Sequence, residues 1–245
     1  MRIDKYLFEK QYAKSRSYAA TMIADGLVFC NGSQVSKASL EVCESDHIEI
    51  RGETLRYVSR GGLKLEGALM TFGIDVEDYV CIDVGSSTGG FTDCLLQRGA
   101  KRVYAVDSGS CQLHEKLSHD PRVIVMENTN VRYMTEDALP ELCDIAVCDV
   151  SFISQTLLHR TITMFLKEGA QFVTLIKPQF EVGREGLGKK GIVKNDSFRQ
   201  KACDRVIESC SSLGLVLIAM MDSPIEGGDG NREFLAHFRY NPKSI

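Results

Sequence analysis

The sequence predicts an α/β protein with a mostly parallel, seven-stranded sheet, preceded by a small α+β unit. From residue 63 onward, short apolar runs alternate with stretches of helical periodicity, which is typical of strands buried between two layers of helices. Residues 1–50 show a different pattern, in which two short helical stretches precede strands joined by a tight turn. A chain of 245 residues is long enough for one large domain and one small one.

The first fifty residues contain clear start and stop signals. Apolar residues at helical spacing predict two short helices over residues 3–25, the second capped by Ser15 and ended by Gly26. The dipeptide Asn31-Gly32 is a strong hairpin signal. We therefore expect strands over residues 27–30, 33–36 and 47–50.

The remaining chain is expected to form a single large domain over residues 61–245, joined by a short linker, residues 51–60, to the unit of residues 1–50. The predicted helices are residues 63–72, 91–97, 154–166 and 197–213. The predicted strands are residues 79–84, 103–106, 123–126, 145–148, 171–176, 215–221 and 233–239.

Charge is distributed unevenly along the chain. The net charge is −4, yet residues 1–37 hold six basic and three acidic side chains, a balance of +3. A basic small end on an acidic body favours a localised contact with a polyanion. The nine cysteines are odd in number and include no C-x-x-C pair, so we expect reduced thiols and no metal site.

The sequence also bears on location. No apolar run approaches the ~20 residues that span a bilayer, and the start, Met1 to Lys5, lacks the apolar core of a signal peptide. We expect a cytoplasmic monomer with no membrane contact.

Polar and glycine residues follow the first predicted strand of the large domain. Asp83 and Gly85 lead into a turn that differs from both the dinucleotide fingerprint and the nucleoside triphosphate loop. The spacing Asp-x-Gly-x-x-x-Gly-Gly instead resembles the cofactor loop of class I (Rossmann-like) methyltransferases, whose ligand is S-adenosylmethionine. The expected contacts in this loop are Asp83, Gly85, Ser86, Ser87, Thr88, Gly89, Gly90 and Phe91.

The next two strand ends support an adenosyl ligand. Asp107 ends the second strand, 22 residues after Gly85, where a carboxylate can accept hydrogen bonds from both ribose hydroxyls. The segment Asn128, Thr129 and Asn130 follows the third strand and supplies short polar side chains for the adenine end.

Four charged residues are candidates for the reacting end. Asp149 ends the fourth strand and Lys177 the fifth, Lys64 precedes the first strand, and Glu233 opens the last. A lysine at the end of an apolar strand is expected to face a polar cavity or a partner. In chain order these four match the Lys-Asp-Lys-Glu set of the FtsJ type of ribose 2′-O-methyltransferase. Asp149 is also expected to contact the methyl-donor end of the cofactor.

The small unit resembles an S4 RNA-binding domain. The resemblance rests on Arg2-Ile3-Asp4-Lys5-Tyr6-Leu7, on Lys14-Ser15-Arg16-Ser17, and on Gly26-Leu27-Val28 followed by Val35. It implies that a basic helix face meets RNA phosphates. The expected RNA contacts are Arg2, Lys5, Lys14, Arg16 and Arg60.

With an S4-like unit before an FtsJ-like domain, the whole chain resembles the TlyA family of ribosomal RNA 2′-O-methyltransferases, a family also named haemolysin A. The resemblance implies methyl transfer to a ribose 2′-hydroxyl, on a cytidine, with ribosomal RNA or ribosomal subunits as the partner. Lys177 is expected to act as general base, although a free lysine titrates near ~10.4. We expect the second cation, Lys64, and partial burial to favour proton loss from Lys177. Glu233 is expected to hold either Lys64 or the ribose.

Three other functions stay open at this point. A haemolysin or pore-forming role lacks a spanning helix or a barrel pattern in the sequence. A non-catalytic RNA-binding or ribosome-assembly factor would not need the four charged residues. A small-molecule methyltransferase would not need the S4-like unit.

Overall fold

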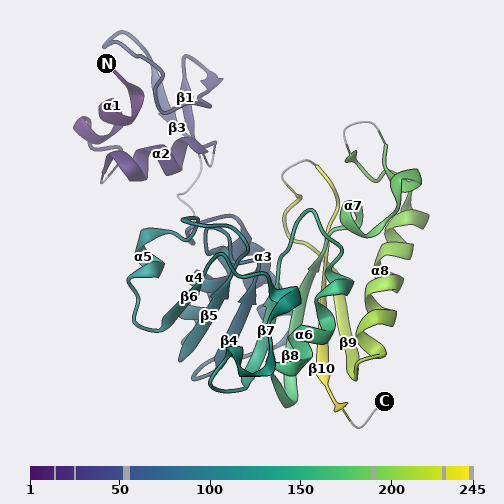
Figure 1. Cartoon of the computed structure of the whole chain (residues 1–245). Helices are drawn as coiled ribbons and strands as arrows, with labels where there is room; N and C mark the ends of the chain where they lie inside the picture. Colours follow the sequence, from purple (N-terminus) through teal and green to yellow (C-terminus); the bar gives the residue numbers. More distant parts are fainter. Residues whose placement is uncertain (14, 25, 52–55, 189–190, 228–229, 243–245) are drawn as a thin grey trace. The chain divides into compact units, whose positions relative to one another are not determined.

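The computed structural model describes residues 1–13, 15–24, 26–51, 56–188, 191–227 and 230–242. The chain folds into two compact units, Met1–Arg60 and Gly61–Ile245 (Figure 1). Residues 52–55, within the expected linker, lie outside the described residues.

The first unit packs two helices on a three-stranded antiparallel sheet. The helices are α1 (Ile3–Glu9) and α2 (Arg16–Ala24), and the strands are β1 (Val28–Cys30), β2 (Ser33–Gln34) and β3 (Ile48–Ile50), with β1 in the middle. Ile3, Leu7 and Val28 are fully buried in a core shared by helices and sheet. Asn31 and Gly32 both have positive φ, 49° and 80°, as the tight hairpin turn requires.

The second unit contains the predicted mostly parallel, seven-stranded sheet, so this prediction is confirmed. The strand order is β6-β5-β4-β7-β8-β10-β9. Strands β4 to β8 run parallel, and β10 is antiparallel to both β8 and β9. The strands are β4 (Val80–Val84), β5 (Arg102–Val106), β6 (Val123–Met126), β7 (Cys143–Cys148), β8 (Leu166–Ile176), β9 (Leu215–Asp222) and β10 (Phe234–Tyr240).

Helices cover both faces of this sheet (Figure 1). Successive side chains of a strand point to opposite faces, so Ile82 and Val84 pack into the core under α6 (His159–Met164) and α8 (Asp196–Ser211). On the other face α3 (Gly61–Phe72) packs against α4 (Gly90–Gln97). Two short helices, α5 (Glu115–Ser118) and α7 (Pro178–Glu181), follow β5 and β8. The sheet is therefore buried, and its carboxyl edge is where ligand-binding loops gather.

One predicted element is wrong. The expected helix over residues 154–166 is a 3₁₀ turn, Gln155–Leu157, followed by the shorter α6, and Leu166 already belongs to β8. Leu166 pairs with Cys143 of β7, and the Cys143 N–H donates to the carbonyl of Phe165. Pairing with β7 therefore ends the helix before its apolar periodicity runs out. Strand β8, expected to begin at residue 171, therefore begins at Leu166, and all other predicted boundaries lie within two residues of the observed ones.

Candidate active site

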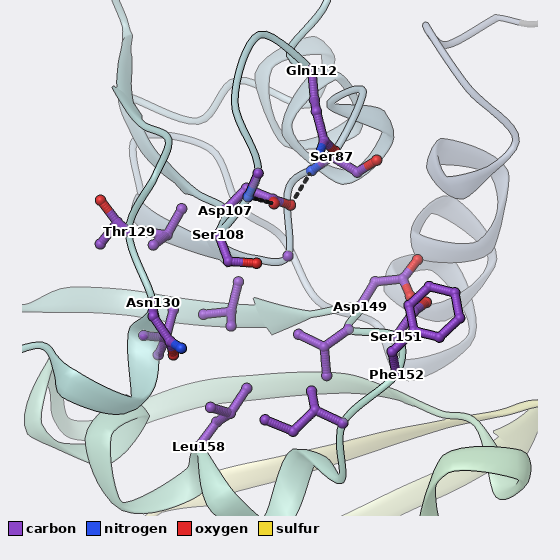
Figure 2. Close-up of a pocket in the computed structure, with 17 residues that line it drawn as sticks. Ser87, Asp107, Ser108, Gln112, Thr129, Asn130, Asp149, Ser151, Phe152 and Leu158 are labelled. Atoms are coloured by element: carbon purple, nitrogen blue, oxygen red, sulfur yellow. Dashed lines mark hydrogen bonds between the residues drawn. The ribbon is translucent and has the colours of Figure 1, made fainter.

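A cavity of about 520 Å³ opens at the carboxyl ends of β4, β5 and β7. Thr129 and Asn130 line one side of it, Asp149 and Phe152 line the other, and Asp107 lies between them (Figure 2). This volume is in the range of small-molecule and cofactor sites. The lining consists of Val84, Gly85, Ser87, Val106, Asp107, Ser108, Gly109, Gln112, Thr129, Asn130, Val131, Asp149, Val150, Ser151, Phe152, Ile153 and Leu158.

Gly85 allows the loop after β4 to approach the end of β7. Its φ is +83°, and a Cβ placed there would lie 2.5 Å from the carbonyl oxygen of Asp149. A side chain at this position would therefore displace the backbone that carries Asp149. Gly89 is restricted for another reason: its φ is +93°, and a Cβ would lie 2.3 Å from the side chain of Leu117.

Asp83 is a fully buried carboxylate at the base of this loop. Its Oδ2 accepts a hydrogen bond of 2.6 Å from the Thr92 hydroxyl, whereas its Oδ1 has no hydrogen-bond partner within the described part of the chain. Burial, with a smaller effect of the nearby Asp149 charge, raises the pKa of Asp83 to about 7. A buried oxygen without a donor fits a cationic or N–H group of a ligand.

Asp107 is held in place by the backbone. The Ser87 N–H donates to Oδ2 at 2.8 Å, and the Gly109 N–H donates to Oδ1 at 2.7 Å, with the Ser87 contact drawn in Figure 2. Each carboxylate oxygen keeps a second acceptor position, so Asp107 can still accept hydrogen bonds from two hydroxyl groups.

The loop after Asp107 supplies cavity residues that the sequence did not single out, namely Ser108, Gly109 and Gln112. A Cβ on Gly109 would lie 1.8 Å from Nε2 of Gln112, so the Gln112 amide closes tightly over that glycine. Glu127 fixes this loop, because its carboxylate accepts the N–H groups of Cys111, Gln112 and Leu113 at 2.6, 2.8 and 3.0 Å. These backbone hydrogen bonds lower the pKa of Glu127.

About half of the expected cofactor residues line the cavity. Gly85, Ser87, Asp107, Thr129, Asn130 and Asp149 do. Asp83, Ser86, Thr88, Gly89, Gly90, Phe91 and Asn128 do not line it. Gly90 and Phe91 are absent from the lining because they form the first turn of α4, which packs in the interior of the unit and buries Phe91. The side-chain oxygen of Asn130 also caps a 3₁₀ turn, by accepting the Arg132 N–H at 3.1 Å.

Lys177 and Asp149 form an ion pair of 2.5 Å at the edge of the cavity. The Lys177 ammonium also donates to the hydroxyl of Ser151 at 2.8 Å. The parallel pairing of Cys148 with Thr174 places the ends of β7 and β8 side by side, which brings these groups together. The two side chains are 13% and 21% exposed, so the pair is shielded but not sealed.

Lys64 and Glu233 form a second pair, with 2.6 Å between Nζ and Oε2. Here the side chains are 11% and 3% exposed. Phe234 pairs with Ile176, so Glu233 and Lys177, which adjoin these residues in the chain, lie at the same end of β10 and β8. The structure thus brings the four candidate residues to one edge of the sheet as two ion pairs.

This pairing corrects one expectation. Lys64 was expected to favour proton loss from Lys177 through repulsion between two cations. Its charge is instead offset by Glu233 at 2.6 Å, and Lys177 has its own carboxylate, Asp149. Of the two roles considered for Glu233, the structure has it holding Lys64.

The turn after β7 contains further cavity residues that sequence reasoning missed, Val150 to Ile153. Phe152 has φ +66° and is 91% exposed, and its ring centroid lies 5.3 Å from that of Phe180 in α7. An aromatic side chain directly after the Asp149 strand end is a signal that could have found this residue.

The expected RNA contacts fall on the first unit. Arg2 and Arg16 both contact the buried Asp4, and Lys5 makes an ion pair of 3.5 Å with Glu9. Arg60, the last residue of the first unit, is exposed. Lys14 lies outside the described residues.

In the part of the chain that the structure describes, no group of three or more histidine, cysteine or acidic side chains is arranged to hold a metal ion. No helix among the described residues is both long and apolar enough to cross a membrane.

Comparison with known proteins defines the class first. Residues 57–240 match the FtsJ-like methyltransferase family, and residues 1–48 match the S4 domain. FtsJ-like methyltransferases use S-adenosylmethionine, and the residues around the cavity fit that ligand: Asp83 offers a buried acceptor, Gly85 a close approach, and Asp107 acceptors for two hydroxyls.

Relatives of nearly the full length identify the family. The TlyA protein of Mycobacterium tuberculosis, named a 16S/23S rRNA (cytidine-2′-O)-methyltransferase, is 38% identical over 97% of this chain and 89% of its own length. YqxC of Bacillus subtilis, provisionally named an rRNA methyltransferase, is 45% identical over 98% of this chain and 85% of its own. A solved structure from Streptococcus thermophilus, provisionally named a haemolysin, has a TM-score of 0.78 at 43% identity and covers 98% of this chain and 88% of its own. The chain belongs to the TlyA family of FtsJ-like methyltransferases.

Proposed function

We propose that this chain transfers the methyl group of S-adenosylmethionine to a ribose 2′-hydroxyl of ribosomal RNA, on a cytidine. The observation that carries the proposal is the Lys177–Asp149 pair with Ser151, placed at the edge of a cofactor-sized cavity. The printed name of the Mycobacterium tuberculosis relative supports both the 2′-oxygen and the cytidine.

The cavity residues divide between the two ends of the cofactor. Asp107 would accept hydrogen bonds from the adenosyl ribose, and Thr129 and Asn130 would meet the adenine. The Gly85 turn would face the amino acid end, and the buried Asp83 behind it would attract the ammonium group through its charge. This orientation directs the reacting end toward Asp149 and Ser151, on the other side of the cavity (Figure 2).

Lys177 would act as the general base. The bound cofactor supplies a methyl group activated by a sulfonium. A ribose hydroxyl is a poor nucleophile until it loses its proton, so a base within hydrogen-bond reach accelerates the transfer. Lys177, which stands as an ammonium beside Asp149, would first release a proton to solvent. Its neutral amine would then accept the hydroxyl proton at Nζ, and Asp149 at 2.5 Å would stabilise the ammonium that forms. The Ser151 hydroxyl would fix the direction of the amine.

The Lys64–Glu233 pair would act by position. It ties α3 to the start of β10, next to the end of β8 from which Lys177 projects. Because both side chains are buried, the pair resists displacement by solvent or substrate. The rate of a transfer reaction depends strongly on how precisely the base is placed. By holding Lys177 in position, the pair would therefore contribute to the rate of methyl transfer.

Ribosomal RNA as the target is supported by the first unit. S4 domains bind RNA, and the matching residues 1–48 include the whole of residues 1–37, which have a charge balance of +3 on a chain of net charge −4. Arg2, Lys5 and Arg16 would contact phosphates there.

The test uses the full chain with ribosomal subunits from cells that lack its gene. We expect native protein to add 2′-O-methylcytidine, located by mass spectrometry. Lys177 does not line the cofactor cavity, so Lys177→Ala should bind S-adenosylhomocysteine within about fivefold of the native affinity yet lose methyl transfer. Full activity in Lys177→Ala would exclude this base, and a methyl group on the cytosine ring would exclude the 2′-hydroxyl as the acceptor.

A further inference from the structure

Asp4 sits between the two arginines that the proposed function assigns to RNA. It lies in the first turn of α1 and is 5% exposed, whereas the side chains of Arg2 and Arg16 are each 51% exposed. A buried carboxylate beneath two exposed guanidinium groups is unusual on a surface meant for a polyanion, because its charge opposes RNA binding.

The contacts of Asp4 use its full acceptor capacity. Oδ1 accepts from Nε of Arg2 at 3.1 Å and from the Lys5 N–H at 2.9 Å. Oδ2 accepts from Nη2 of Arg2 at 3.1 Å and from Nη2 of Arg16 at 2.8 Å. These hydrogen bonds, that from Arg16 foremost, lower the pKa of Asp4 to about 2, so it stays ionised in any physiological buffer.

The geometry points to Asp4 as a positioning residue for RNA binding: it holds Arg2 and Arg16 as one preformed pair that reads the phosphate backbone. This inference rests on the proposed function, and it adds which residue organises the RNA-binding surface. Arg2 precedes α1 and Arg16 begins α2, and Asp4, the partner that they share, brings their guanidinium groups to one carboxylate.

The arrangement suits phosphate chemically. A guanidinium carries five N–H groups, of which Arg2 uses two and Arg16 one on Asp4, so each can still donate to a phosphate oxygen. Without Asp4, two long side chains of like charge would separate and sample many rotamers. Binding would then have to immobilise them, a cost that preorganisation removes.

For the substitution Asp4→Asn, charge and preorganisation predict opposite changes in the affinity for RNA. Asp4→Asn removes a negative charge from the RNA-binding surface, so charge alone predicts tighter binding. The positioning role predicts the reverse. We expect the affinity for unmethylated ribosomal subunits to fall about tenfold and KM to rise with kcat unchanged, because only preorganisation is lost.

A matched control comes from the same unit. Glu44 is exposed, and Glu44→Gln also removes one negative charge. It should bind subunits as tightly as native protein or slightly more tightly. In an Arg2→Ala/Arg16→Ala background, Asp4→Asn should cause no further loss. Native or higher affinity in Asp4→Asn would overturn the inference.

Two more measurements keep the inference testable. If Asp4→Asn fails to fold, as judged by its thermal transition, Arg2→Lys/Arg16→Lys keeps both charges and Asp4 but loses the forked geometry. The inference expects about tenfold weaker binding there as well, and native affinity would overturn it. Undiminished binding in Arg2→Ala/Arg16→Ala would instead count against the proposed RNA contacts themselves.

Discussion

Two lysine–carboxylate pairs lie at the same edge of the sheet, and their surroundings differ. Lys64–Glu233 is sealed, with side chains 11% and 3% exposed, and its two partners come from α3 and from the residue just before β10. Lys177–Asp149 is more open, at 13% and 21%, and Asp149 and Ser151, which both contact Lys177, line the cavity.

This difference fits the proposed roles, in which one pair is structural and the other takes part in proton transfer. A largely buried pair is costly to break, so Lys64–Glu233 keeps its charges in place. A partly open pair costs less to rearrange, so Lys177 can turn from Asp149 to a substrate hydroxyl without leaving a buried charge unpaired. This difference supports the proposal that Lys177 accepts the proton and that the Lys64–Glu233 pair holds the site in place.

The variant with the largest expected effect, Lys177→Arg, distinguishes a role of Lys177 as a base from a role of its positive charge. Lys177→Arg keeps a cation beside Asp149, but arginine stays protonated and cannot act as a base. We expect the single-turnover rate of methyl transfer to fall by about 10³-fold. If Lys177→Arg kept a tenth or more of the native rate, Lys177 would act through its charge. The two pairs would then not differ in the way proposed here.

The next effect concerns stability. Lys64→Met leaves the buried Glu233 charge unpaired, so we expect the free energy of unfolding to fall by about 3 kcal/mol in chemical denaturation. Replacing both partners, in Lys64→Met/Glu233→Met, should recover most of this loss. Lys177→Met should cost about 1 kcal/mol or less, because its pair is more open. Equal losses in the two single variants would remove the distinction between the pairs.

Asp83 differs from both pairs, because it is a buried carboxylate that forms no ion pair with the residues that the structure describes. Its pKa is raised to about 7, so it is largely neutral at pH 6 and largely ionised at pH 8. The ionised form is the one that attracts an ammonium group, so affinity for S-adenosylhomocysteine should rise about tenfold from pH 6 to pH 8. Calorimetry on Asp83→Asn should show weaker binding without this rise, and an unchanged slope there would assign the titration to another group.

The smallest effect tests the orientation of the base. Ser151→Ala removes one hydrogen bond to Lys177, so we expect the transfer rate to fall about fivefold with cofactor affinity little changed. Ser151→Thr keeps the hydroxyl and serves as the control, with a rate near native. A native rate in Ser151→Ala would show that Asp149 alone orients the amine.

The sequence predicted the sheet well because buried parallel strands have a strong local pattern. The start of β8 was missed, since its pairing of Leu166 with Cys143 depends on a strand distant in sequence. The helix expected to continue to residue 166 is also weakened by β-branched residues such as Thr161 and Ile162.

The site was predicted in part, for a similar reason. Asp107 and Asp149 stand directly at strand ends, so the topology places them in the cavity. Gln112 reaches it only because Glu127 binds three backbone N–H groups of its loop, which no local pattern reveals. Conversely, Phe91 belongs to the glycine-rich segment but turns inward with α4. Which of the four charged residues pair with each other could likewise not be predicted without the fold.

The proposed methyl transfer and its base can be tested together by mapping ribose methylation on ribosomal RNA from cells that lack this gene, complemented with either native protein or Lys177→Ala. We predict a 2′-O-methylcytidine that is absent from the deletion, restored by native protein and not restored by Lys177→Ala at equal protein level. A mark that persists in the deletion, or one that Lys177→Ala restores fully, would contradict the account.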